Sequence, residues 1–242
     1  MALVPASTTS SARTGNALLD ALPDGDRARL LDGAWFRGVD AEQPLVHAGS
    51  RIDTLWFPVT AVVSLLATLR DGSAIETATI GREGVVGAVV FLGDDRLRNG
   101  RAVVQLAGEV IGVPAETFRA AVADGPTLHA AMNGYTRALL FQLTQGVACS
   151  AAHSVRDRIA RWLLQTTDRV GREEVELTQQ FLSEILHARR ASVTEALASL
   201  EADGAVRRSR GRIEIRARPA LESAACECYG SVRAAYAAIV DS

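Results

Sequence analysis

The sequence predicts an α+β protein in which a β-rich part, one long helix and a small, mainly helical part follow one another. Three observations support this order. Short Val- and Ile-rich runs separated by Gly and Asp turns fill residues 35–113, a stretch with few helix breakers fills residues 126–149, and two short helical patterns followed by two Arg-rich strands fill residues 177–216. The chain has 242 residues, of which 48% are hydrophobic and 22% charged, a composition typical of a globular protein.

The basic residues exclude several function classes, because all 26 of them are Arg and the chain contains no Lys. Without an ammonium group there is no phosphate loop ending in Gly-Lys, no Schiff-base lysine and no kinase lysine. The sequence also lacks the Gly-x-Ser-x-Gly, His-Glu-x-x-His and Gly-x-Gly-x-x-Gly motifs. We therefore predict no catalytic residues and no enzymatic activity.

The N-terminus and the longest apolar stretches bear on location. Residues 1–15 are rich in Ser, Thr and Ala, which indicates a disordered segment, and they lack the basic start and apolar run of a signal peptide. The longest uncharged stretches, 54–69 and 138–155, are too short or too polar to span a bilayer. We expect a cytoplasmic protein with no membrane partner.

Charge is distributed unevenly along the chain. Residues 1–149 carry 12 Arg and 15 acidic residues, residues 150–218 carry 13 Arg and 10, and residues 219–242 carry one Arg and three. The basic excess is largest in residues 187–218, where eight Arg accompany four acidic residues. Such a local excess indicates a face that binds nucleic acid, and the alternative is a solvated surface of internal salt bridges.

The first domain is predicted over residues 16–125. It begins with one or two short helices over residues 16–31, broken at Pro23-Asp24-Gly25. The runs that follow are rich in Val, Ile and Thr and are separated by turn signals such as Asp71-Gly72. Many short strands at this spacing predict an antiparallel sandwich or barrel.

A long helix is predicted over residues 126–149, starting after Asp124-Gly125. Six of its residues recur at alternating steps of four and three, a spacing typical of a coiled-coil seam. They are Leu128, Met132, Tyr135, Leu139, Gln142 and Gly146. We predict that they form the interface of a homodimer; the alternative is a core helix packed on the β domain of the same chain.

Residues 150–218 are predicted to form a winged helix-turn-helix domain. Thr178 is a suitable N-cap for a helix of little more than two turns. A tight turn at His187-Ala188 leads to a second helix that ends at Asp203-Gly204, as in a helix-turn-helix motif. Two strands around Ser209-Arg210-Gly211 then form an Arg-rich β wing.

The outward residues of this motif have the chemistry that double-stranded DNA requires. A helix fits the major groove, and an Arg at its start can donate two hydrogen bonds to guanine. The start of the preceding helix suits phosphate oxygens, and the wing suits the backbone or the minor groove. The predicted DNA-binding residues are Thr178, Gln179, Arg189, Arg190, Ser192, Thr194, Arg210 and Arg212.

The order of these parts resembles the bacterial transcription regulators typified by the cyclic-AMP receptor protein and the fumarate–nitrate reduction regulator, the CRP/FNR family. The resemblance covers about residues 16–218 and rests also on Ser154–Leu164 and Leu177–Val206. It implies an N-terminal β-roll like a cyclic-nucleotide-binding domain, a homodimer on an inverted-repeat operator, and RNA polymerase as a partner. It places Arg190 at the family's guanine-reading arginine, whereas Ala191 replaces the usual Glu.

The resemblance also locates an effector pocket, where this sequence departs from the family. The family has Gly-Glu and, after a loop, Arg-Ser or Arg-Thr. The matching residues here are Gly87 and Ala88, then Arg98 and Asn99, with Arg101 as a second candidate anion partner. Because the ribose-binding carboxylate and the hydroxyl residue are missing, we expect no bound cyclic nucleotide and an unidentified signal for the β-roll.

Two other functions stay open. One is a regulator that does respond to a cyclic nucleotide, and the other is a β-roll signalling module that acts through protein partners with a vestigial helix-turn-helix. No cofactor is predicted. The absence of any Cys before Cys149 disfavours an iron–sulfur cluster, whereas His47 and His129 leave a haem open.

The cysteines are Cys149, Cys226 and Cys228, too few for a disulfide framework. No His or further Cys is near Cys226 and Cys228 in the sequence, so a metal would lack ligands and no metal site is predicted. We expect reduced thiols; the alternative is a redox switch at this pair. Residues 219–242 are predicted to form an added helix that packs on the DNA-binding domain.

Overall fold

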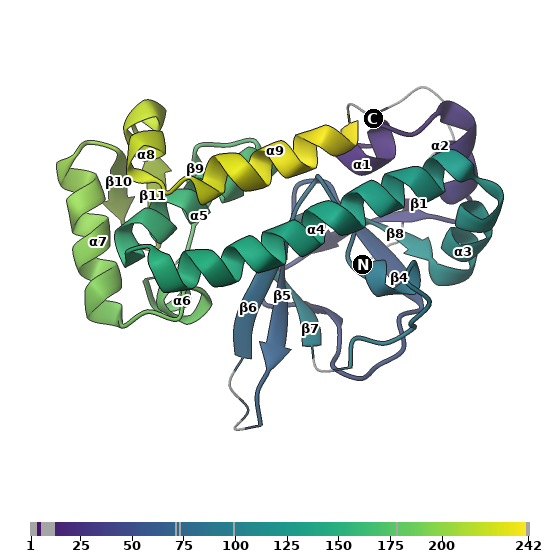
Figure 1. Cartoon of the computed structure of the whole chain (residues 1–242), viewed down its shortest axis with the longest axis horizontal. Coiled ribbons are helices and arrows are strands. Elements are labelled where there is room, and N and C mark those ends of the chain that lie inside the picture. The colour runs from purple at the N-terminus through teal and green to yellow at the C-terminus, as the bar shows by residue number, and fades with distance from the viewer. Residues whose placement is uncertain are drawn as a thin grey trace. The chain divides into compact units, whose positions relative to one another are not determined.

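The computed structural model describes residues 4–5, 13–70, 72, 74–98, 100–177 and 179–240. The chain divides into two compact units, one of Met1–Leu140 with Tyr236–Ser242 and one of Phe141–Ala235 (Figure 1). Two helices, α4 (Pro126–Ala152) and α9 (Cys228–Val240), begin in one unit and end in the other. None of the described helices combines the length and the hydropathy that a bilayer span requires.

The first unit is built on two antiparallel sheets, which confirms the predicted β-rich domain. One sheet contains, in spatial order, β1 (Val4–Pro5), β2 (Trp35–Val39), β8 (Gly108–Pro114) and β4 (Thr54–Pro58). The other contains β3 (Pro44–Val46), β7 (Gly100–Leu106), β5 (Val62–Thr68) and β6 (Ala74–Ile80). The β-branched and aromatic residues of these runs fit a pleated, half-buried surface, which is why they form strands.

The packing of the first sheet depends on a glycine between two tryptophans. Gly112 on β8 is paired with Trp35 on β2 and with Trp56 on β4. The two indole rings meet edge to face with centroids 5.9 Å apart. A Cβ atom on Gly112 would lie 2.6 Å from the Trp35 ring and 2.9 Å from the Trp56 ring, so a larger residue would force the rings apart.

A buried asparagine attaches the N-terminal helices to the sheets. The short helices of this unit are α1 (Ala17–Asp20), α2 (Asp24–Leu30), η1 (Ala88–Val90) and α3 (Ala115–Asp124). Asn16 Nδ2 donates to the carbonyls of Pro58 at 2.8 Å and Gly84 at 3.0 Å, and Asn16 Oδ1 accepts from Leu19 N–H at 3.1 Å. Asn16 therefore caps α1 and joins it to the end of β4 and to the turn at Gly84.

Most of residues 1–15, the segment predicted to be disordered, lies outside the described residues. Two described parts of it have partners. Val4 and Pro5 of β1 pair with β2, and the backbone N–H of Thr14 donates to Asp20 Oδ1 at 2.7 Å.

Helix α4 buries most of the predicted dimer seam inside its own chain. The buried seam residues are Leu128, Met132, Tyr135 and Gln142. The Tyr135 hydroxyl donates to the carbonyl of Val85 at 2.9 Å, and its ring occupies the position that a Cβ atom on Gly84 would take. Side chains buried in this way cannot contact a second chain. These four residues are therefore packed within their own chain, as the core-helix alternative describes, and the dimer contact stays a prediction.

A different face of α4 is exposed and apolar. Leu140 is 61% exposed, Phe141 39% and Val147 73%. Leu140 and Val147 follow Leu139 and Gly146, which are half-buried. A shift of one position rotates the face of a helix by about 100°. The apolar stripe that α4 presents to solvent is thus rotated from the predicted seam.

The second unit contains the predicted helix-turn-helix and wing. Its elements are α5 (Val155–Val170), β9 (Glu174–Glu176), α6 (Gln179–Ile185), α7 (Arg190–Ala202), β10 (Val206–Ser209), β11 (Arg212–Ile215) and α8 (Arg218–Ala224). Helix α5 begins with a capping box in which Ser154 and Asp157 exchange side-chain and backbone hydrogen bonds. Strand β11 lies between β10 and β9 in an antiparallel sheet, so β9 adds a third strand to the predicted wing.

The C-terminal residues form α8 and α9, and they are not confined to the DNA-binding part. The last turns of α9 belong to the first unit, where the Tyr236 ring centroid lies 6.2 Å from that of Tyr135 on α4. Ile239 Cγ2 lies 3.5 Å from the position of a Cβ atom on Gly134. Residues 228–235 of α9 belong to the second unit, and only the end of the helix lies in the first unit, where Gly134 leaves room for it.

Candidate nucleic-acid interface and cysteine–histidine cluster

The turn between α6 and α7 is held by local hydrogen bonds. The backbone N–H of Ala188 donates to the carbonyl of Ser183 at 3.0 Å, and His187 adopts the left-handed region with φ of 47°. The guanidinium of Arg158 on α5 donates to the carbonyl of Leu186 at the end of α6. The turn lies at the predicted position, and its hydrogen bonds orient the start of α7.

The predicted DNA-binding residues lie on the surface wherever the structure describes them. The exposed ones are Gln179, Arg189, Arg190, Thr194, Arg210 and Arg212, and Ser192 is half-buried. Thr178 lies outside the described residues. The Thr194 hydroxyl donates to Gln179 Oε1 at 2.9 Å, so the starts of α6 and α7 are adjacent, as a shared DNA contact requires.

Part of the basic excess is used in ion pairs within the unit. Arg212 lies 3.4 Å from Glu174 and 3.0 Å from Glu176, both on the neighbouring strand β9. Arg208 binds Glu201 through two side-chain nitrogens at 2.8 and 2.6 Å, and the N–H groups of Arg208 lower the pKa of Glu201. Arg208 and Arg212 therefore fit the alternative given for the basic excess, a solvated surface of internal salt bridges.

Three other arginines of the motif differ in this respect. Arg189, Arg190 and Arg210 have no side-chain ion pair or hydrogen bond within the part of the chain that is described. Arg189 is the N-cap of α7 and Arg190 its first residue, while Arg210 is in the turn of the β10–β11 hairpin. Exposed guanidinium groups without a carboxylate partner keep their full charge for an external anion.

The predicted effector-pocket residues are divided between the interior and the surface. Gly87 has φ of 98°, and Ala88 is buried at the start of η1. Arg98 and Arg101 are exposed, and Arg98 Nε lies 3.3 Å from Asp94 Oδ2. Among the described residues, no hydrogen bond joins either arginine to Gly87 or Ala88. The two arginines are therefore not linked to Gly87 and Ala88 by hydrogen bonds among the described residues, and the effector pocket stays a prediction.

A polar cluster on β5, β6 and β7 was not predicted. Ser64 Oγ and Gln105 Nε2 both donate to Glu76 Oε2, at 2.5 and 2.8 Å. Ser64 and Gln105 are buried, and Gln105 Oε1 has no hydrogen-bond partner among the described residues. A buried acceptor without a partner marks a place where a polar ligand or a water can bind. The sequence signal that could have revealed this cluster is the presence of polar residues at inward positions of otherwise apolar strands.

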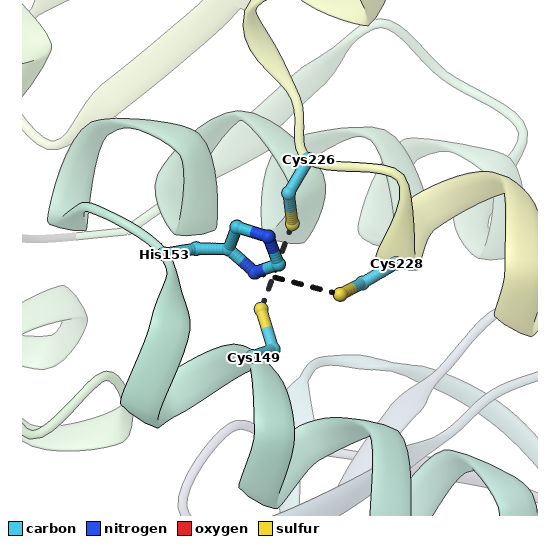
Figure 2. Close-up of side chains that lie close together, drawn as sticks. All are labelled: Cys149, His153, Cys226 and Cys228. Carbon is cyan, nitrogen blue, oxygen red and sulfur yellow. Dashed lines mark hydrogen bonds between the residues drawn. The ribbon is translucent and has the colours of Figure 1, made fainter.

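Four metal-ligating side chains converge in the second unit, and we call them the Cys3His cluster: Cys149, His153, Cys226 and Cys228 (Figure 2). Cys149 is near the end of α4 and His153 follows that helix, whereas Cys226 and Cys228 are at the α8–α9 junction. The sulfurs of Cys149 and Cys226 are 3.6 Å apart, as are Cys228 Sγ and His153 Nδ1. All four ligand atoms lie within 4.8 Å of one another.

The groups around the Cys3His cluster hold its donors in place. His153 Nε2 lies 3.2 Å from Glu227 Oε2, and Gln145 Nε2 donates to Cys228 Sγ at 3.0 Å. A hydrogen bond from the Cys226 thiol and the charge of Arg161 lower the pKa of Cys149 to about 5. Cys149 is therefore the thiol that ionises first.

The sequence argument that a metal would lack ligands does not hold in the fold. Cys149 lies 77 residues from Cys226, and His153 lies 75 residues from Cys228, yet both pairs are in contact. The signal that could have found the cluster is the four-residue spacing of Cys149 and His153, which brings them together at the end of α4, where the backbone N–H of His153 donates to the carbonyl of Cys149 at 3.1 Å.

Two family models match the chain. Residues 36–124 match the model described as cyclic nucleotide-binding domain, and residues 157–224 match the Crp-like helix-turn-helix domain. No curated protein has a sequence that matches this chain. The four residues of the Cys3His cluster lie outside both matched ranges. Cys149 and His153 precede residue 157, and Cys226 and Cys228 follow residue 224.

Solved structures of bacterial regulators share the fold. FixK2 from Bradyrhizobium japonicum superposes with a TM-score of 0.67 at 17% identity, covering 80% of this chain and 98% of its own. The c-di-GMP responsive regulator CLP from Xanthomonas campestris gives 0.63 at 19%, covering 80% and 99%. A transcriptional regulator of the CRP family from Thermus thermophilus gives 0.64 at 18%, covering 78% and 96%.

Proposed function

We propose that this chain, which belongs to the CRP/FNR family of transcription regulators, acts as a homodimer on an inverted-repeat DNA operator. The observation that carries the proposal is the charge on the helix-turn-helix unit. Arg189, Arg190 and Arg210 are exposed and have no carboxylate partner among the described residues. Cations in this arrangement fit the phosphates and base edges of double-stranded DNA. No enzymatic role is proposed.

Three residues of the motif are each assigned one role in DNA binding. Arg190, the first residue of α7, reads a guanine in the major groove. Gln179, hydrogen-bonded to Thr194, and the unpaired Arg210 bind phosphate. Ala191 is exposed and offers no acceptor to a cytosine amino group, so the operator differs at that base from one read by a Glu.

The second copy is proposed to dock on the exposed stripe of α4. Phe141 and Val147 are apolar and lie on the solvent side of the helix. A two-fold axis along this stripe presents one α7 helix from each copy to the same side of the DNA. The half-sites are then inverted and about 34–36 Å apart, one turn of the double helix.

The β-rich unit is proposed to sense a signal other than cyclic AMP. Ala88 has no carboxylate for a ribose hydroxyl, and Arg98 is paired with Asp94. The buried, unpaired Gln105 Oε1 offers a different polar position within this unit. Calorimetry with cyclic AMP is expected to give no binding heat; micromolar binding that also tightens DNA binding would contradict this. RNA polymerase is the expected protein partner, and the cytoplasm the expected location.

Operator selection tests the DNA-binding proposal. The full chain is used to select sequences from random duplexes, and the selected site is footprinted. We expect a protected region with inverted symmetry for the wild type and a relaxed preference at one base pair per half-site for Arg190→Ala. Arg82→Ala, which removes an exposed arginine of the first unit, is the matched control. A footprint without inverted symmetry, or no DNA retained at low salt, would refute the proposal.

A further inference from the structure

We propose that the Cys3His cluster binds one zinc ion, with the sulfurs of Cys149, Cys226 and Cys228 and the Nδ1 atom of His153 as ligands (Figure 2). The proposal does not depend on the DNA-binding function, because the cluster is at the α4–α5 and α8–α9 junctions and includes no residue of the helix-turn-helix face.

The distances fit a tetrahedral ion. Bonds of about 2.3 Å to sulfur and about 2.0–2.1 Å to nitrogen place two sulfurs about 3.8 Å apart, and a sulfur and a nitrogen about 3.6 Å apart. The structure gives 3.6 Å between Cys149 Sγ and Cys226 Sγ, and 3.6 Å between Cys228 Sγ and His153 Nδ1. Cys3His is also one of the ligand sets of closed structural zinc sites.

Two other fates of these cysteines fit less well. A cluster of several irons with bridging sulfides occupies the space between its ligands, whereas here all four ligand atoms lie within 4.8 Å and leave room for one ion. A disulfide between Cys149 and Cys226 would give no role to Cys228 and His153, which also face the centre (Figure 2). One thiophilic ion uses all four donors.

The surrounding hydrogen bonds are those that a zinc site needs. A zinc-bound histidine donates its other ring N–H to a carboxylate or a carbonyl, which fixes the tautomer and the ring. Glu227 Oε2 is 3.2 Å from His153 Nε2, so Nδ1 keeps its lone pair for the metal. Gln145 donates to Cys228 Sγ, and the positive charge of Arg161 acts on Cys149. The Gln145 N–H group and the Arg161 cation offset the net negative charge that three thiolates leave on a divalent ion.

The position of the cluster assigns the ion a structural role. The three cysteines form a buried group of their own. Cys149 and His153 mark the end of α4, and Cys228 is the first residue of α9. One ion therefore joins the end of α4 to the start of α9 within the second unit. The residues involved lie outside the two ranges that the family models match.

Metal content and cobalt spectroscopy test the proposal on the full chain. The protein is purified without a metal-affinity step under reducing conditions, and its metals are measured by mass spectrometry. We expect one zinc per chain, and the Co2+-substituted protein should show intense visible d–d bands and near-ultraviolet thiolate charge transfer. Cys228→Ser should lose the zinc, and Glu227→Gln should weaken zinc affinity about 10- to 100-fold. His129→Gln, an exposed histidine on α4, is the matched control.

Two further variants keep the test decisive if Cys228→Ser does not fold. His153→Cys supplies a fourth sulfur and should retain zinc, while His153→Ala should bind zinc more weakly and release it to a chelator faster. Three results would each overturn the proposal. They are reduced, folded protein that binds neither zinc nor Co2+, a Cys149–Cys226 disulfide as the stable form in mass spectra, and iron with sulfide in the purified protein.

Discussion

The two wing arginines, Arg210 and Arg212, test how this protein binds DNA. The sequence predicts that both contact DNA, but in the structure only Arg212 has carboxylate partners among the described residues. Arg212 is within 3.4 Å of Glu174 and 3.0 Å of Glu176, whereas Arg210 has no carboxylate partner among the described residues. A guanidinium that is already paired releases few counterions from DNA, so Arg210→Ala should change the salt dependence of binding and Arg212→Ala should change it little.

The magnitude follows from counterion release. Each phosphate contact contributes about −0.9 to the slope of log K against log salt, so one Arg210 contact per protomer contributes about −1.8 in a dimer. Between 50 and 200 mM salt, that part of the slope corresponds to about a 12-fold change in affinity. The Arg210→Ala variant should therefore lose about 12-fold less affinity than the wild type over this range.

The assay is a fluorescence-anisotropy titration of one selected operator and one scrambled duplex at several salt concentrations. Arg210→Ala should flatten the slope on both duplexes equally, because phosphate contacts do not depend on sequence. Arg212→Ala should keep the wild-type slope and should cost about 1 kcal/mol or less in stability, since its ion pairs are exposed. Equal slopes for all three proteins, or equal flattening by both variants, would refute the reasoning.

Three further predictions concern base reading, the dimer and the core. Arg190→Ala should cost about 1–3 kcal/mol per half-site and relax specificity at one base pair, as measured by anisotropy on single-base operator variants. Val147→Glu should give monomers in sedimentation velocity with little loss of protomer stability, because Val147 is 73% exposed. Met132→Ala should leave the dimer intact and lower the unfolding free energy by about 2–5 kcal/mol, because Met132 is buried. Tyr135→Phe leaves the Val85 carbonyl without its partner and should cost about 1–3 kcal/mol in denaturant unfolding, and an unchanged midpoint would contradict it.

The sequence by itself determined the elements whose patterns are local. The strands of the first unit follow from β-branched runs between turn signals, and the helix-turn-helix follows from two apolar helical faces with a turn at His187. Periodicity alone did not predict the exposure of Arg190, because Val193 and Leu197, three and seven positions later on the same helix face, are buried. Arg190 is exposed at the first position of α7.

The tertiary structure alone decided which surfaces and partners those elements meet. The predicted seam of α4 could face a second chain or its own β unit, and Tyr135, one of its residues, is buried and donates to the carbonyl of Val85 in the β unit. Arg212 is predicted from the sequence to contact DNA, but in the fold β9 brings Glu174 and Glu176 beside it, 38 and 36 residues away in sequence. The Cys3His cluster joins residues more than 70 positions apart. Such contacts depend on the path by which the chain returns to itself, and periodicity within one element contains no information about that path.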